Sequence, residues 1–149
     1  MRPLKLKISA FKSYGGKEEI DFEKLGNDGI YLITGKTGAG KTTIFDAISF
    51  ALFGSPSGKI DEVSTLRSKY AQEDIPTFVE LTFSYKNKMY YIKRNPSYER
   101  KSKRGKFETV TEASKVEFHL PNGKILTKKN EVNEKIKDIL GVNEIQFRQ

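Results

Sequence analysis

The sequence contains no cysteine and only one histidine among its 149 residues. Without cysteine, the chain can form neither a disulfide framework nor a thiolate metal site. One histidine cannot supply a histidine-based zinc site. We expect this histidine, His119, to lie in a strand and to face solvent, because it stands between Phe118 and Leu120. The apolar runs are too short to span a bilayer, and the amino terminus lacks the apolar block of a signal peptide. These absences lead us to expect a cytoplasmic protein.

The composition is that of a folded domain, with 36% hydrophobic and 31% charged residues. The length corresponds to one domain of roughly 150 residues. The net charge of +8 is concentrated in one segment, because residues 86–106 hold nine basic residues and one acid. The rest of the chain has 18 basic and 18 acidic residues. Such a segment suggests a polyanionic partner, although a solvated hairpin tip would have the same composition.

Hydrophobic periodicity predicts an α/β fold. Alternating residues at 4–11 and 19–22 indicate half-buried strands, and the compact apolar run at 30–33 indicates a strand buried on both faces. Helical spacing at 41–53 predicts a nearly buried helix that ends at Gly54. The remaining pattern predicts a loop with a short helix at 55–74 and a hairpin at 77–92. It also predicts a strand at 116–120 and an amphipathic helix at 132–140. We therefore expect the first helix to pack on a mixed sheet beside an antiparallel β region.

The strongest motif is GKTGAGKT at Gly35–Thr42, a full match to the phosphate-binding pattern G-x-x-x-x-G-K-[ST]. Glycines let backbone amides form a nest around phosphate oxygens, and the start of the next helix also favours an anion. Lys41 would reach the β- and γ-phosphates, the Thr42 hydroxyl would coordinate Mg²⁺, and Thr43 would contact the α-phosphate. The predicted loop comprises Gly35, Lys36, Thr37, Gly38, Ala39, Gly40, Lys41, Thr42 and Thr43. The alternative is a glycine-rich turn that binds nothing.

The sequence lacks the other half of a phosphoryl-transfer site. Such a site also needs an acid that ends a second apolar strand and holds the metal. Glu80 interrupts an alternating strand, and Asp46 lies inside the predicted helix, so neither fits. We therefore predict no catalytic residue within this chain. Its end at residues 147–149, without a helix cap or a polar tail, predicts a fragment of a longer polypeptide.

Three segments carry a resemblance to a known family: ISAFKSYGGKEEIDF, GIYLITGKTGAGKTTIFDAISFALFG, and FVELTF followed by a basic hairpin. Together they resemble the N-terminal half of the head of an SMC-like, ABC-type ATPase. Within that group they are most similar to the SbcC family, which acts with the nuclease SbcD in DNA repair and recombination.

The resemblance implies that a C-terminal half, joined through a long coiled coil, supplies the metal-binding acid, the catalytic glutamate and the signature motif. Two heads would then enclose two ATP molecules with Mg²⁺, and ATP hydrolysis would gate an SbcD-like nuclease on double-stranded DNA ends or hairpins. It also implies that this chain alone hydrolyses ATP weakly or not at all.

The resemblance also assigns residues outside the phosphate loop. Lys12 would lie near the phosphates with Ser13 beside it, although Lys12 would also fit an exposed strand end. The segment Thr65, Leu66 and Arg67 would lie against adenine and ribose. The glutamine that senses Mg²⁺ would follow Gln149, so Gln146 and Gln149 are expected to be lead-in residues.

The basic segment 86–106 is predicted to contact DNA, and Tyr90, Tyr91 and Tyr98 lie among its basic residues. Basic residues on a ribbon suit sequence-independent contact with backbone phosphates, which weakens as salt rises. The predicted contacts are Lys93, Arg94, Arg100, Lys101, Lys103, Arg104 and Lys106. In the alternative interpretation, Tyr90 packs inward and the lysines only solvate the surface.

Two other functions use the same motif. A small P-loop kinase could take lid arginines from Arg94, Arg100 and Arg104, but its phosphate-loop strand would begin near the first residue. A non-catalytic nucleic-acid-binding module would use the glycine loop only as a turn. A transporter ATPase would be a relative of the SMC-like head. The A-F-K-S-Y segment and the basic hairpin argue against a transporter.

Overall fold

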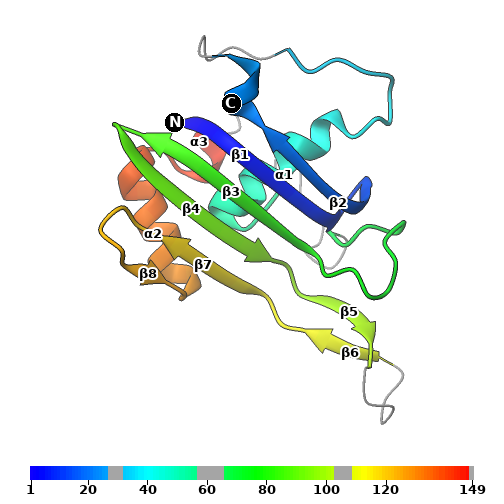
Figure 1. Ribbon diagram of the computed structural model, residues 1–149. Helices are drawn as coiled ribbons and strands as arrows, with labels where there is room; N and C mark the ends of the chain where they lie inside the picture. Colours follow the sequence, from blue (N-terminus) through cyan, green and yellow to red (C-terminus); the bar gives the residue numbers. More distant parts are fainter. Residues whose placement is uncertain (27–31, 57–65, 103–108, 148–149) are drawn as a thin grey trace.

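The computed structural model describes residues 1–26, 32–56, 66–102 and 109–147. These residues form one six-stranded sheet, with helices on one face and a two-stranded ribbon at one end (Figure 1). The strands are β1 (Arg2–Phe11), β2 (Tyr14–Asp21), β3 (Phe78–Tyr85), β4 (Lys88–Asn95), β5 (Tyr98–Lys101), β6 (Thr109–Glu112), β7 (Lys115–His119) and β8 (Ile125–Leu126). The helices are η1 (Phe22–Leu25), α1 (Lys41–Phe53), α2 (Lys129–Leu140) and α3 (Glu144–Phe147).

The large sheet has the order β2-β1-β3-β4-β7-β8, and each neighbouring pair is antiparallel. The predicted α/β class and the antiparallel region are therefore observed. The predicted mixed sheet is not, because every strand pairing in the described parts of the chain is antiparallel. Most neighbours in this sheet follow one another closely in sequence, and short connections produce antiparallel pairs.

The strand predicted at residues 30–33 is the clearest difference. Residues 30 and 31 lie outside the described ranges, while Leu32 and Ile33 are not in a strand, and Leu32 is 88% exposed. A strand that is buried on both faces needs hydrogen-bonding neighbours. None of the described strands pairs with Leu32 or Ile33, so the apolar pattern alone does not produce a strand here.

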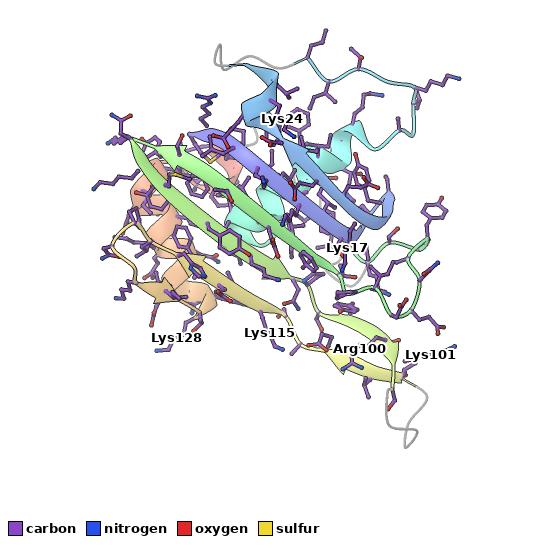
Figure 2. The ribbon with its side chains drawn as sticks, viewed as in Figure 1. Lys17, Lys24, Arg100, Lys101, Lys115 and Lys128 are labelled. Carbon is purple, nitrogen blue, oxygen red and sulfur yellow. The ribbon has the colours of Figure 1, made fainter. Side chains whose placement is uncertain are left out.

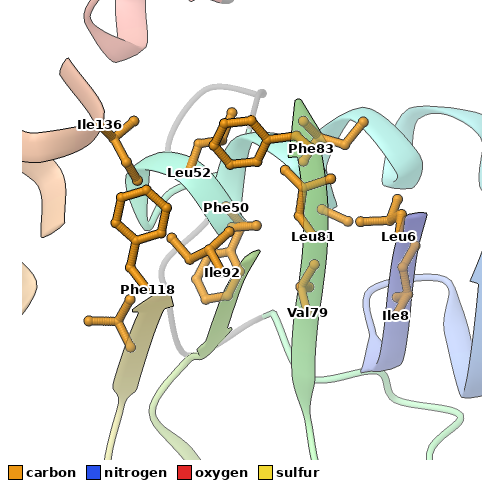
Figure 3. Close-up of a cluster of buried hydrophobic side chains, with 14 of the residues drawn as sticks. Leu6, Ile8, Phe50, Leu52, Val79, Leu81, Phe83, Ile92, Phe118 and Ile136 are labelled. Atoms are coloured by element: carbon orange, nitrogen blue, oxygen red, sulfur yellow. The ribbon is translucent and has the colours of Figure 1, made fainter. Parts of the chain in front are cut away.

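The core lies between the inner face of the sheet and the helices (Figure 3). Alternate residues of β1, β3, β4 and β7 point inward, as the period of two predicted. Nine of the 13 residues of α1 are buried, and α2 buries Val132 and Ile136. The largest fully buried side chains are Phe11, Phe50, Phe83, Phe118, Leu6, Ile8, Leu52, Leu66, Leu81, Ile92, Ile136 and Val79.

Both long helices end as the sequence predicted. Gly54 follows α1 and Gly141 follows α2, each with a left-handed backbone and an amide that donates to a carbonyl of the last turn. Residues 55–56 and 66–74 contain no helix, whereas residues 57–65 lie outside the described ranges, so the short helix expected within segment 55–74 stays a prediction. None of the described helices combines the length and apolar character needed to cross a membrane.

Candidate nucleotide-binding site

The phosphate-loop motif lies directly before α1. Gly38 and Gly40 have φ values of +85° and +83°, a backbone region that glycine enters without strain. Gly40 is the N-cap of α1, and no side chain in the described residues caps it. The amides at the start of a helix attract anions, because they lack carbonyl partners and lie at the positive end of the helix dipole. This end of α1 therefore has the geometry of an anion site.

The side chains of the motif extend this site. The Lys41 ammonium lies across the loop and donates to the carbonyls of Gly35 and Lys36, at 2.6 and 2.8 Å. Thr42 is exposed, whereas Thr43 is buried. The Thr43 hydroxyl lies 3.0 Å from that of Ser13. Contact of Thr42 with Mg²⁺ and of Thr43 with the α-phosphate stay predictions.

The turn between β1 and β2 lies along the first half of α1. The Lys12 ammonium is 2.7 Å from Asp46 Oδ2, and the Ser13 and Thr43 hydroxyls are 3.0 Å apart. The Tyr14 hydroxyl donates to the Gly40 carbonyl at 3.4 Å. Three consecutive residues of this turn thus contact positions 46, 43 and 40, which are spaced three apart along α1 and its N-cap. Lys12 and Ser13 therefore lie beside α1. Their contact with phosphate stays a prediction.

Tyr14 is a neighbour of the phosphate loop that the sequence analysis did not name, and Asp46, considered there only as a metal ligand, pairs with Lys12. Burial raises the pKa of Tyr14, so its hydroxyl remains a donor near neutral pH. The Tyr14 ring also closes the space beside Gly40, because a Cβ there would lie 3.1 Å from the ring. The signal available in the sequence was spacing, since positions 40, 43 and 46 fall near one face of a helix.

The backbone that carries Lys12 is unusual. Ala10 and Lys12 have positive φ values of +46° and +48°, and the pairing of β1 with β2 shifts register between Ser9 and Phe11. The strand end is held from the other side by the Lys12 amide, which donates to the Leu66 carbonyl at 2.9 Å. Bulges of this kind change the direction of a side chain and are frequent beside functional sites.

The segment predicted to contact adenine and ribose is partly described. Thr65 lies outside the described residues, and Leu66 is fully buried. Arg67 organises its own loop by donating to Gln72 O, Ile75 O and Thr77 Oγ1. A hollow of about 180 Å³ is lined by Lys12, Ser13, Arg67, Lys69 and Tyr70. Arg67 thus borders the same hollow as Lys12, and its contact with a nucleoside stays a prediction.

The basic segment 86–106 is not a single hairpin. Lys86 and Lys88 flank the β3–β4 turn, whereas Arg100 and Lys101 lie in β5, beyond the other end of β4 (Figure 2). The predicted contacts Lys103, Arg104 and Lys106 lie outside the described residues.

Several cations of this segment have acidic partners. Lys93 pairs with Glu80 at 2.8 Å, and Lys101 pairs with Glu73 at 2.7 Å. Arg100 Nε lies 3.1 Å from Glu112, and this hydrogen bond lowers the pKa of the glutamate. Of these three pairs, only Lys101–Glu73 joins mostly exposed side chains, 69% and 62%, and such pairs contribute little energy. Contact of Lys93, Arg100 and Lys101 with DNA stays a prediction.

Arg94 corrects the predicted DNA surface. Its side chain is only 4% exposed, and it donates to Ala51 O, Leu52 O and Asn133 Oδ1 at 3.1–3.2 Å. Burial lowers its pKa to about 10, so it stays charged at neutral pH. The prediction that Arg94 contacts DNA is wrong, because alternation along β4 places it on the inner face.

Tyr90 and Tyr98 are also buried. Tyr90 stacks on Phe83, with ring centroids 5.1 Å apart, and Tyr98 lies under the Arg67 guanidinium. The inward alternative for Tyr90 is therefore the observed one. Tyr91 faces outward beside His119, whose imidazole contacts Glu117.

A family model described as an AAA domain matches residues 5–149. The chain belongs to the AAA domain family. The match includes the phosphate loop, the β1–β2 turn and the basic segment, so all three features are part of the AAA domain.

Individual relatives are consistent with this assignment. Proteins named as the SbcC component of the nuclease SbcCD, from Staphylococcus saprophyticus, Staphylococcus aureus and Vibrio cholerae, are each 40% identical over 152 residues. The alignments cover all of this chain and 15% of each relative. The resemblance to SbcC that the motifs indicated is thus confirmed, and the AAA domain described here spans about one seventh of those relatives.

Proposed function

We propose that this chain is the ATP-binding, N-terminal half of the head of an SbcC-type ATPase. The observation that carries the proposal is the glycine-capped start of α1, with the Lys41 ammonium placed across the loop. The AAA family match and the SbcC relatives support ATP as the ligand. Lys41 and the loop amides would hold the phosphates, and Thr42 would hold Mg²⁺, which supplies charge neutralisation when bound.

We further propose that hydrolysis needs polypeptide beyond this chain. The sequence offers no acid at the end of a second apolar strand. Phe45 is 56% exposed, although most of its neighbours in α1 are buried. A mainly apolar hollow of about 610 Å³ adjoins the phosphate loop and is lined by Met1, Ile33, Lys41, Thr42, Phe45, Ile48, Ser49 and Phe147. A C-terminal half of the head would cover it, and this chain alone would be a weak or inactive ATPase.

The name of the relatives, a subunit of the nuclease SbcCD, supports an SbcD-like nuclease as a proposed partner. We infer that ATP binding joins two heads and that the assembled protein controls an SbcD-like nuclease on double-stranded DNA. Transfer of phosphate to a small acceptor is not favoured, since the relatives are named as parts of a nuclease.

Nucleotide binding is tested by Lys41→Ala in the full-length protein, with Lys17→Ala, an exposed surface lysine, as the control. Charge-assisted hydrogen bonds contribute about 1.5–3 kcal/mol each, so we expect the affinity for Mg-ATP to fall at least about 10-fold. Fluorescent nucleotide titration gives the affinities. Equal affinity of the Lys41→Ala and unsubstituted proteins would refute the proposed site.

DNA contact is tested by reversing the charges of Lys101, Lys103 and Arg104 together. Each lost phosphate contact should reduce the slope of log affinity against log salt by about 0.9, as well as the affinity itself. Binding of duplex DNA to the full-length complex is measured over a salt series. Unchanged affinity and slope would remove the β5–β6 ribbon from the DNA surface.

A further inference from the structure

Asp46 is a buried acid in a helix that has little apparent need for one. Among the 13 residues of α1, only Lys41 and Asp46 are charged, and Asp46 is 2% exposed. A buried ion pair is seldom more stable than apolar side chains of similar volume, because both charges lose their hydration. The neighbouring Ala47 and Ala51 show that this helix accommodates apolar residues. Stability is therefore a weak reason for a carboxylate at this position.

One partner of Asp46 is a lysine on a strained backbone. The Lys12 ammonium lies 2.7 Å from Asp46 Oδ2, and Lys12 itself has a left-handed φ of +48°. Non-glycine residues adopt such conformations where surrounding contacts enforce them, and they concentrate at functional sites. Here the Lys12 amide is fixed by the Leu66 carbonyl. Both the backbone and the ammonium of Lys12 are thus held from separate elements.

The fixed ammonium lies beside Asp46, the sixth residue of α1, and the next residue of the turn contacts a position nearer the phosphate loop. Ser13, the next residue, shares a hydrogen bond with Thr43, and Lys12 lines the hollow of about 180 Å³ beside it. A free lysine side chain loses rotamer entropy when it is immobilised on a ligand. Fixing it in advance removes part of that cost from binding.

We propose that Asp46 is a positioning residue for the nucleotide site. Its carboxylate holds the Lys12 ammonium beside the second turn of α1, from where Lys12 acts with Lys41 as a second preorganised cation for the nucleotide phosphates. This inference rests on the proposed nucleotide site and assigns a role to a side chain that does not itself touch the ligand.

The sign of the effect separates positioning from simple electrostatics. A carboxylate near a triphosphate repels it, so removing the charge of Asp46 would by itself tighten binding. If Asp46 positions Lys12, its removal instead weakens binding, because the ammonium is no longer held in place. The two roles therefore predict opposite changes in affinity.

The experiment is a double-mutant cycle in the full-length protein. The variants are Asp46→Asn, Lys12→Met and the double substitution, with Asp138→Asn, an exposed acid of α2, as the matched control. We expect Asp46→Asn and Lys12→Met each to weaken Mg-ATP binding about 10-fold, and the double variant to be no weaker than Lys12→Met. Asp46→Glu should recover part of the loss. Calorimetric titration well below the melting temperature restricts the comparison to folded protein.

Affinity that is unchanged or tighter in Asp46→Asn overturns the inference, and so do losses that simply add in the double variant. If Asp46→Asn does not fold, Asp46→Glu and Lys12→Arg replace it, because both keep the charges but change their reach. Wild-type affinity in both would then overturn the inference. Loss of binding in Lys41→Ala shows in each case that the proposed site itself stands. If Lys41→Ala also binds normally, the site and this inference fall together.

Discussion

The role predicted for Arg94 from the charge of its neighbours differs from its role in the structure. Its neighbours in the chain are basic, so charge density assigned it to a DNA surface. Its strand position was the better guide, because Tyr90, Ile92 and Arg94 alternate on the inner face of β4. The guanidinium donates hydrogen bonds to two backbone carbonyls at the end of α1 and to the side-chain carbonyl oxygen of Asn133 in α2. It is therefore a buried anchor that joins three elements.

Replacing Arg94 by alanine should destabilise the region around α1. The substitution leaves the Ala51 and Leu52 carbonyls without this donor and opens a cavity, so we expect a loss of roughly 2–4 kcal/mol in the free energy of opening. Hydrogen exchange of the α1 amides in the full-length protein measures it. Lys101→Ala, a change at a residue whose side chain is 69% exposed, should cost less than about 1 kcal/mol. Similar protection in the two variants would contradict the anchoring role.

At the scale of elements, α1 is the best predicted part of the molecule. Its bounds agree with the sequence prediction, because the phosphate-loop glycines mark its start and Gly54 marks its end. β3, β4, β7 and α2 also agree, since each has a clear period of 2 or 3.6. Leu32 and Ile33, the described half of the strand expected at 30–33, are not in a strand, because an apolar run does not reveal whether a hydrogen-bonding neighbour exists. The β5–β6 ribbon was missed because charged residues obscure its alternation.

The two glycine caps allow a matched test of close packing. Gly54 and Gly141 have similar left-handed φ values of +85° and +70°, but only at Gly54 would a Cβ meet a side chain, 2.7 Å from Arg94 Nη1. The Cβ of Gly141→Ala would have open space, so we expect a cost of about 1 kcal/mol from backbone strain. Gly54→Ala should cost about 1–3 kcal/mol more, because Arg94 must move.

Exchange protection of the last turn of α1 and of α2 reports each cost in the full-length protein. Equal losses in the two variants would show that Arg94 adjusts freely, and would weaken its assignment as an anchor.

At the scale of the whole molecule, the described fold has one covered face of α1 and one uncovered face. The sheet covers Ile44, Ala47 and Phe50, while Phe45 projects into the apolar hollow beside Lys41 and Thr42. The sequence could predict that α1 is apolar nearly all round. It could not show which side lacks a cover, because burial depends on segments far away in the chain.

Substituting Phe45 should therefore separate folding from assembly. Phe45→Asp places a carboxylate on the uncovered face. Burying this carboxylate under the other half of the head, without a counter-charge, costs several kcal/mol. We expect the ATPase rate of the full-length protein to fall at least about 10-fold, while the protection of β3 and β4 is retained. The exposed Ile125→Asp in β8 serves as the control, since Ile125 is 49% exposed and lines neither that hollow nor the one beside Lys12. Normal activity of Phe45→Asp would show that this face needs no cover.

The order of elements along the chain has a consequence for biosynthesis. α1 precedes β3 and β4, yet it packs against both of them as well as against β1. On the ribosome, its apolar surface is complete before the strands that bury it have been translated. Until residue 95 has left the exit tunnel, this helix is a target for chaperones and for aggregation, so α1 and the phosphate-loop motif before it are most vulnerable during that interval of synthesis.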